Sequence, residues 1–390
     1  MSAMKKLFQI MADKKASDIF LSVGAPINIK LNGVAMPVNQ AVMTAETVQQ
    51  LLYEVLNERQ IKEFEDEMEL NTAYNLAGVG TFRISAMRQK GSPAVVVRYI
   101  PGTIPSLDSL GVPEVLKEII MGKRGLILMV GATGSGKSTS LSAMLDFRNE
   151  RKSGHILTLE DPVEFIFQNK KSIVNQREVG TDTQTLETAL KNALRQAPDC
   201  ILIGEIRDKP TMSMALAYAQ TGHLCLATLH ANNSYHAMNR IINFYPLETR
   251  ASLLLDLAAA LQAVISLRLV RTKTGARVPA VEILLNTRNI SELIEKGEIS
   301  EMKEALEKSL APGSQTFEQA LFKLFMDGKI TQDEALSNAD SASNMLWLIN
   351  QATAGELSLN GAPNLPAKPG DDKKEAGTAA FNDFKINVNA

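Results

Sequence analysis

The sequence predicts an α/β protein in which a small α+β domain precedes a larger α/β domain that ends in a helical segment. Three features predict this fold. Apolar, strand-like runs such as "GLILMV", "HILTLE", "DCILIGE" and "LCLATL" alternate with helical patterns. The stretch "GATGSGKSTS", residues 131–140, joins one of these runs to a helix, and from Arg288 onward the pattern is all-helical. Alternation of buried strands and helices is typical of a mostly parallel, doubly wound sheet.

The composition indicates a globular protein of two or three domains. The chain has 390 residues, of which 45% are hydrophobic, and this is enough to bury a substantial core. The most apolar stretch, residues 253–270, is interrupted by Asp256 and Arg268, so no membrane span is expected. The N-terminal sequence does not resemble a secretory signal, and we expect a cytoplasmic location.

The charge balance argues against a general attraction to nucleic acid or anionic lipid. Lys and Arg number 41 and Asp and Glu 43, which gives a formal net charge of -2. A net charge near zero is compatible with a local basic patch, and that alternative stays open. The two cysteines, Cys200 and Cys225, lie in apolar runs and are predicted to be buried, reduced thiols.

The first domain, residues 1–100, mixes helical and strand patterns. Asn32-Gly33 within "INIKLNGVAMPV" is a hairpin signal after a short amphipathic helix. One helical patch, "VQQLLYEVLNERQIKEFEDEME", follows, and "TFRISAMRQKGSPAVVVRYI" predicts two strands around Gly91. We therefore expect a small α+β domain.

Proline and glycine mark the next boundary. Residues 101–113, "PGTIPSLDSLGVP", cannot continue a helix or a central strand and are predicted to be a linker. The α/β core then covers residues 114–287, and a helical subdomain covers residues 288–355. Residues 356–390 are rich in Gly, Pro, Ala and charge, which predicts a disordered tail.

A phosphate-binding loop is predicted at the start of the core. "GATGSGKSTS" fits G-x-x-x-x-G-K-[ST] and lies between a strand and a helix, as this motif requires. Backbone N–H groups of such a loop bind phosphates, the lysine offsets their charge and the serine hydroxyl of Ser138 ligates Mg²⁺. The alternative is a flexible glycine turn. We expect ATP and Mg²⁺ here, with these binding residues: Gly131, Thr133, Gly134, Ser135, Gly136, Lys137, Ser138 and Thr139.

Acidic residues follow two of the predicted strands. Glu205 comes directly after "ILIG", and Glu160 and Asp161 end "HILTLED". Ligands of open α/β sheets bind at the carboxyl ends of the strands, where a carboxylate can orient water or help to hold magnesium. The alternative is that these are surface acids. His223 and His230 flank a further strand, and one of them is a candidate γ-phosphate sensor, although His223 also fits a core histidine.

Four segments, "GATGSGKSTS", "HILTLEDPVEF", "ILIGEIRD" and "TGHLCLATLH", follow one another in a recognisable order. They resemble the Walker A, Asp, Walker B and His boxes of the bacterial secretion ATPase superfamily. The branch that they resemble is that of the type IV pilus retraction ATPases, PilT and PilU. "SDIFLSVGAPINIKLNG" and "GTFRISAMRQKG" extend the resemblance to most of residues 1 to about 350.

The resemblance implies a homo-hexamer whose subunits each have a PAS-like N-terminal domain and a RecA-like P-loop NTPase domain, with ATP between them. By motif, Glu205 is the Walker B catalytic acid, Glu160 is the Asp-box acid that holds Mg²⁺ through water, and His230 belongs to the His box. Arg83 and Arg98 match N-domain arginines that approach the γ-phosphate, where an arginine contributes a factor of about 10³ to 10⁵ in rate. The alternative is that both are strand-face residues paired with acids.

Three segments favour the PilU-type branch. "VEILLNT", "TFEQALFKLFMDGKIT" and "DEALSNADSASN" resemble PilU-like chains, whereas "NTRNISELIEKGE" keeps only the outline of the "AIRNLIRE" motif of PilT proteins. Two isolated cysteines rule out the paired CxxC metal insert of assembly and secretion members. The resemblance implies a retraction ATPase at the cytoplasmic face of the inner membrane. Its partners would be a PilT-type paralogue and a PilC-type platform protein, without nucleic acid and with only peripheral membrane association.

The residues leave other functions open: an autonomous PilT-type motor, a RecA-like nucleic-acid translocase, or a non-enzymatic ATP-binding accessory subunit. A translocase requires a basic or aromatic strand-binding surface, which the net charge of -2 and 5% aromatic residues disfavour. Intact Lys137, Glu160 and Glu205 argue against an inactive site. In the helical segment, apolar residues such as Leu321 and Leu324 fit either domain packing or a partner-binding face.

Overall fold

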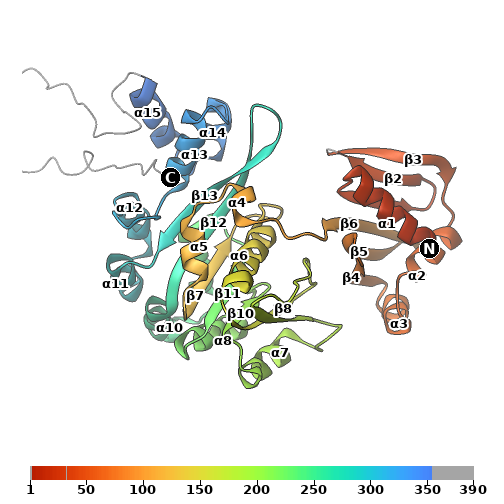
Figure 1. Cartoon of the computed structure of the whole chain (residues 1–390), viewed down its shortest axis with the longest axis horizontal. Coiled ribbons are helices and arrows are strands. Elements are labelled where there is room, and N and C mark those ends of the chain that lie inside the picture. The colour runs from red at the N-terminus through yellow and green to blue at the C-terminus, as the bar shows by residue number, and fades with distance from the viewer. Residues whose placement is uncertain (1, 32, 354–390) are drawn as a thin grey trace, which may run out of the picture. The chain divides into compact units, whose positions relative to one another are not determined.

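The computed structural model describes residues 2–31 and 33–353 (Figure 1). The predicted disordered tail, residues 356–390, lies outside these residues. The chain divides into two compact units. The first comprises residues 1–104 together with two later segments, 160–168 and 176–184, and the second comprises 105–159, 169–175 and 185 onward.

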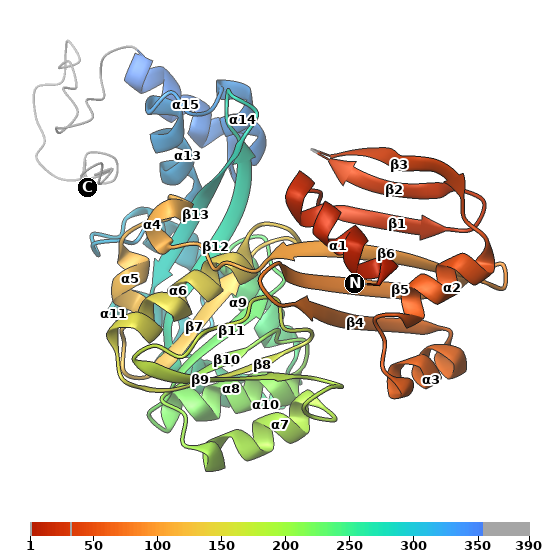
Figure 2. The same cartoon turned by 45° about the vertical axis from the view of Figure 1, so that its right-hand side comes forward.

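The first unit contains a six-stranded antiparallel sheet in the order β3-β2-β1-β6-β5-β4 (Figure 2). Its strands are β1 (Asp18–Ser22), β2 (Pro26–Leu31), β3 (Val34–Val42), β4 (Glu69–Leu76), β5 (Gly80–Gln89) and β6 (Ser92–Pro101). Its helices are α1 (Ala3–Lys14), α2 (Ala45–Tyr53) and α3 (Glu58–Glu67). The predicted hairpin is present, since Leu31 pairs with Val34 and Gly33 has φ +87°.

One face of this sheet forms the core of the first unit. Phe82, Ile84 and Ala86 of β5 are at most 2% exposed, because successive residues of a strand point to opposite faces. Helix α1 lies across the sheet (Figure 2). The ring of Phe8 on this helix stacks on that of Phe82 with centroids 4.0 Å apart. The predicted α+β domain is confirmed.

Two local expectations for the first unit were incomplete. The single helical patch is two helices, because Asn57 caps α3: its Oδ1 accepts from the Gln60 N–H at 2.9 Å, and the Gln60 Oε1 accepts from the Asn57 N–H at 3.0 Å. Such a reciprocal cap starts a new helix. Strand β4 was not foreseen from its mixed sequence "ELNTAYNL".

The segment predicted to be a linker contains a short helix, α4 (Leu107–Leu110). It forms because Ser106 Oγ accepts from the Ser109 N–H at 3.3 Å, which caps the first turn. Gly111 ends the helix in the left-handed region with φ +67°. The segment thus holds a short helix of its own, which was not foreseen from the sequence, and its role as a linker stays a prediction.

The second sheet has seven strands in the order β13-β12-β7-β11-β10-β8-β9 (Figure 1). They are β7 (Gly125–Val130), β8 (Gly154–Glu160), β9 (Ser172–Glu178), β10 (Cys200–Ile203), β11 (Leu224–Leu229), β12 (Leu261–Arg271) and β13 (Arg277–Leu285). The pairs from β12 through β7, β11 and β10 to β8 are parallel, and β13 pairs antiparallel with β12. The predicted mostly parallel sheet is confirmed.

Helices bury both faces of this sheet. They are α5 (Val115–Ile120), α6 (Lys137–Arg151), α7 (Leu186–Ala193), α8 (Lys209–Gln220), α9 (Ser234–Asn243), α10 (Leu247–Ala260), α11 (Arg288–Lys296) and α12 (Met302–Glu307). Leu126, Leu128 and Val130 of β7 pack into one core with α7 to α12, and the intervening Ile127 and Met129 are also fully buried. A strand buried on both sides is typical of a doubly wound sheet.

The last helices pack against the far ends of β12 and β13. They are α13 (Phe317–Met326), α14 (Gln332–Asn338) and α15 (Ala342–Thr353). Phe317, Leu321 and Met345 are fully buried in one cluster with Val270 and Ala280 of the two strands. The apolar residues that fitted either packing or a partner face, Leu321 and Leu324 among them, therefore serve packing.

Both cysteines lie in the interior of the seven-stranded sheet. Cys200 and Cys225 are free thiols with no exposed surface. Burial raises the pKa of Cys200 to about 12 and raises that of Cys225 as well. Across the described ranges, no helix is both long and apolar enough to cross a membrane.

We predict that neither thiol reacts in the folded chain, because the thiolate is the reactive form and burial suppresses it. A chromogenic disulfide reagent should label neither cysteine in native buffer and both in denaturant. Leu247→Cys is the control, since Leu247 is 75% exposed and the substitution should add one rapidly labelled thiol. Rapid labelling of the unsubstituted native chain would contradict the prediction.

Candidate functional site

The P-loop, residues 131–138, leaves the buried strand β7 at a position that admits only glycine. Gly131 has φ +151°, and a Cβ there would lie 2.5 Å from Ser135 Oγ and 2.6 Å from the Leu267 carbonyl oxygen. Gly134 and Gly136 also have positive φ, +79° and +93°. Three glycines therefore fold the backbone back on itself between β7 and α6, in a conformation that other residues rarely adopt.

The start of α6 offers donors for an anion. Gly136 occupies the N-cap position and has no side chain to satisfy the N–H groups of the first turn, which also lie at the positive end of the helix dipole. Ser135 Oγ is buried and has no hydrogen-bond partner. Lys137 is 8% exposed, and its Nζ donates to the carbonyl oxygens of Gly131 at 2.8 Å and Ala132 at 2.9 Å. This donor set fits the phosphates of a nucleotide.

The remaining predicted loop residues are ordered by the same turn. Thr133 and Gly134 are exposed at the tip of the loop, whereas Ser138 and Thr139 are half-buried in the first turn of α6. Ser138 follows Lys137 directly, and its hydroxyl is a hard oxygen of the kind that Mg²⁺ prefers as a ligand.

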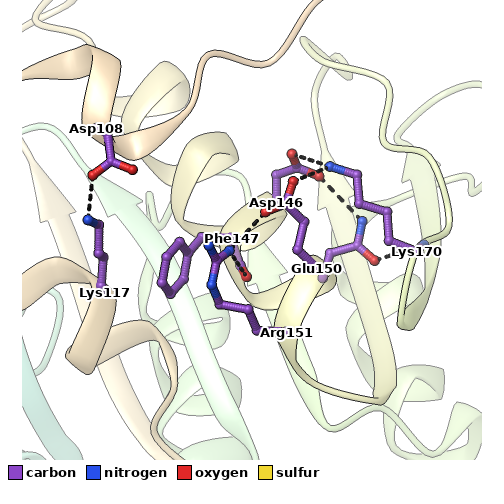
Figure 3. A network of polar contacts seen from close by, with 8 residues as sticks. Asp108, Lys117, Asp146, Phe147, Glu150, Arg151 and Lys170 are labelled. Atoms are coloured by element: carbon purple, nitrogen blue, oxygen red, sulfur yellow. Dashed lines mark hydrogen bonds and ion pairs between the residues drawn. The ribbon is translucent and has the colours of Figure 1, made fainter.

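Helix α6 is fixed at its other end by charged side chains (Figure 3). Lys170 Nζ lies 2.7 Å from Asp146 Oδ2 and 2.9 Å from Glu150 Oε1. The buried Arg148 donates through Nη1 to the carbonyl oxygens of Ile120 at 2.7 Å and Gly122 at 2.9 Å. The Arg148 contacts could not be predicted from the sequence, because an arginine in a helix is usually solvent-exposed. They hold the helix that carries the P-loop.

Glu205 and His230 meet at the carboxyl ends of β10 and β11. Glu205 Oε1 lies 3.4 Å from His230 Nε2, and Glu205 Oε2 accepts from Arg207 Nε at 2.7 Å. Burial lowers the pKa of His230, and the positive charge of Lys137 lowers it further. Glu205 and a hydrogen bond to the Gly131 carbonyl act in the opposite direction. The imidazole is thus mainly neutral at neutral pH, has one N–H to donate, and lies between the Gly131 carbonyl and the Glu205 carboxylate.

Glu160 ends β8, the strand next to β10. Leu159 and Ile203 are in register, and the Gly204 N–H donates to the Leu159 carbonyl at 2.8 Å. Glu160 and Glu205 therefore follow adjacent parallel strands at the same edge of the sheet. Glu160 Oε1 accepts a long hydrogen bond from Gln176 Nε2 at 3.4 Å.

Arg83 and Arg98 stand directly opposite each other on β5 and β6. Arg98 Nε lies 2.9 Å from Asp18 Oδ1, and Arg83 Nη1 lies 2.9 Å from Glu164 Oε1. In this structure both arginines thus have the acidic partners that the alternative interpretation named. The sequence did not identify Asp18 or Glu164 as those partners, because strand pairing and a distant loop bring them there.

His223 does not belong to the site. It precedes β11, and its carbonyl accepts from the N–H of Gly125, the first residue of β7. Since β7 and β11 are parallel, His223 lies at the edge opposite the P-loop. Its Nδ1 is 3.1 Å from Thr221 Oγ1 and 3.3 Å from the Tyr218 carbonyl, which identifies a structural histidine. Of the two histidines, His230 is the one at the P-loop.

Comparison with known proteins agrees with this geometry. The family model described as type II/IV secretion system protein matches residues 2–312. The chain belongs to this family. It is 46% identical to the type IV pilus ATPase PilU of Pseudomonas aeruginosa over 346 residues, which cover 88% of this chain and 91% of that protein.

Two further relatives place the chain within the family. It is 39% identical to the type IV pilus retraction ATPase PilT of Pseudomonas aeruginosa over 339 residues, 87% of this chain and 98% of that protein. A crystal structure of the pilus retraction motor PilT with bound ADP superposes with a TM-score of 0.81 at 36% identity. The superposition covers 88% of this chain and 98% of the PilT chain in that structure. The chain is therefore a member of the PilT/PilU group of pilus ATPases.

We predict that Gly131→Ala destabilises the nucleotide-free chain much more than Gly134→Ala. At Gly131 a side chain is strained and meets Ser135 and the Leu267 backbone, which should cost about 2–5 kcal/mol of unfolding free energy. At Gly134 nothing lies within 4 Å, so only the left-handed backbone costs about 1 kcal/mol. Urea unfolding without nucleotide measures both, and equal losses would show that the close approach at Gly131 does not matter.

Proposed function

We propose that the chain hydrolyses ATP with Mg²⁺ and that this activity drives or assists type IV pilus retraction. The observation that carries the proposal is the convergence of Gly131, Lys137, Glu205 and His230 at one edge of the sheet. A phosphate cradle beside a carboxylate and a neutral imidazole fits phosphoryl transfer to water. Membership of the PilT/PilU group supports a role for this ATPase in the type IV pilus machinery.

Each residue then has a defined task. The N–H groups at the start of α6 and Lys137 bind the phosphates, and Ser138 and Glu160 would hold Mg²⁺, with Glu160 acting through water. The metal supplies positive charge that offsets the charge of the phosphates. Glu205 orients the attacking water and accepts its proton, and His230 holds that carboxylate in place. Arg83 and Arg98 exchange their acidic partners for the γ-phosphate.

The assembly that we propose is a homo-hexamer at the cytoplasmic face of the inner membrane. In this proposal, residues 1–100 form a PAS-like domain, residues 114–287 a RecA-like core, residues 288–355 a helical subdomain and residues 101–113 the connection. The hexamer would act as a co-motor with a PilT-type paralogue on a PilC-type platform protein, without nucleic acid. The higher identity to PilU, 46% against 39% to PilT, supports the co-motor.

An autonomous PilT-type motor is the second candidate. The match to PilT extends over 98% of that protein. This chain therefore lacks no large segment of PilT whose loss would explain dependence on a paralogue. The intact P-loop and Glu205 suit either motor. The two candidates therefore differ in dependence on a paralogue rather than in chemistry.

We predict that this chain supports retraction only in company with the paralogue. In the bacterium that carries it, the paralogue is deleted or made catalytically inactive, and pilus retraction is measured under applied load. The co-motor should rescue retraction beside the inactive paralogue and fail when the paralogue is missing. Glu205→Ala should abolish the rescue, because it removes the carboxylate that orients water.

The control is Glu292→Gln, which changes a half-exposed helical carboxylate that pairs with Arg288 at 2.9 Å and should leave rescue intact. Retraction that persists without the paralogue and disappears with Glu205→Ala would establish the autonomous motor instead. Rescue that survives Glu205→Ala would mean that ATP hydrolysis by this chain does not drive retraction.

A further inference from the structure

The turn that carries His230, residues 230–233, is held by side chains from three separate elements. It connects β11 to α9 and places His230 beside Glu205 and the Gly131 carbonyl. Its backbone has no regular secondary structure, so its shape depends on contacts from outside. These contacts come from β12, from β13 and from the segment between α14 and α15.

The first holder is Arg268 of β12. Its Nη2 donates to the Asn232 carbonyl at 3.2 Å and pairs with Asp340, and its Nη1 donates to the Asn338 carbonyl at 2.5 Å. The guanidinium also lies 3.8 Å from the centre of the Phe317 ring. The planar fork of an arginine can make all of these contacts at once, whereas a lysine cannot.

The second holder is Asp340, from the segment between α14 and α15. Its Oδ2 accepts from Asn233 Nδ2 at 2.7 Å, and Asn233 is 7% exposed and caps α9. The carboxylate is 14% exposed, so its two hydrogen-bonded partners are only weakly screened by water. The neighbouring Ser341 N–H is in turn fixed by the buried Glu318 Oε1 at 2.8 Å.

The third holder is the buried Glu282 of β13. Its Oε1 accepts from the Ser234 N–H at 2.7 Å and from Ser266 Oγ at 2.9 Å. This contact fixes the first residue of α9, directly after the turn. The turn is therefore tied to the sheet by Arg268 and Glu282 and to the last helices by Asp340.

We propose that Asp340 and Arg268 are positioning residues for His230. They fix the turn 230–233, which presents the imidazole to Glu205, and so link the helical C-terminal segment to ATP hydrolysis. The inference rests on the proposed function, because His230 matters only if Glu205 activates water. Movement of α13 to α15 would then alter the rate of hydrolysis without touching the nucleotide.

The test is a double-mutant cycle on the purified full chain. Asp340→Ala should lower kcat for ATP hydrolysis about tenfold with KM changed less than about twofold, because a displaced catalytic group affects the chemical step. In a His230→Ala background the same substitution should have no further effect, because it acts through the imidazole. Equal losses in both backgrounds would overturn the proposal.

The matched control is Asp327→Ala. Asp327 belongs to the same helical segment and pairs only loosely with Lys329 at 3.3 Å, away from the turn. It should leave kcat unchanged. A loss as large as that of D340A would show a general effect on the segment and would overturn the proposal. If D340A does not fold, Asp340→Asn takes its place in the cycle, because it removes the charge and keeps the shape.

A second readout separates this inference from the proposed function. In histidine-labelled chain, the imidazole NMR signals of His230 are assigned by their loss in His230→Gln. The chemical shifts of these His230 signals should change in D340A and remain the same in D327A. A shift in a chain that hydrolyses no ATP would contradict the proposed function but support the positioning. Unshifted signals would overturn the positioning even if the chain is an active ATPase.

Discussion

Parallel pairing of β7, β11 and β10 is the constraint on which the site depends. Parallel neighbours end at the same edge of a sheet, so the P-loop after β7, Glu205 after β10 and His230 after β11 meet without any long side chain. The strands are buried on both faces, and a register shift of one residue would exchange the faces of each strand. The hydrophobic core thus fixes the geometry of the polar site.

That edge of the sheet carries the buried cation Lys137 and an ion pair between Glu205 and Arg207. Lys137 is held over the P-loop by two carbonyl oxygens, and Glu205 is held by Arg207 and His230. The lowered pKa of His230 keeps the imidazole neutral, so it can donate a hydrogen bond without adding a further positive charge. Arg207 and His230 therefore direct the Glu205 carboxyl group while the loop offers positive charge to an anion.

Local signals were sufficient to predict much of this arrangement. The P-loop, Glu205 and the strand that precedes each of them are encoded in a few consecutive residues. The alternation of strands and helices along the chain predicted the parallel sheet. Contacts between segments that are distant in the sequence could not be predicted in this way, because no local pattern encodes them. Asp18 and Glu164 reach the two arginines, and Arg268 reaches Asp340, only after the sheets and last helices have packed. The Asn57 cap that separates α2 from α3 was local and could have been recognised.

In the proposed mechanism the P-loop binds ATP and Glu205 activates the water that cleaves it. Steady-state ATP hydrolysis by the purified full chain should be compared with that of Glu205→Gln, with nucleotide binding measured on the same samples. We expect equal binding and a turnover lowered about 10²-fold or more, because the amide cannot accept the proton. Unchanged turnover in the variant would contradict the assignment of Glu205 and the mechanism built on it.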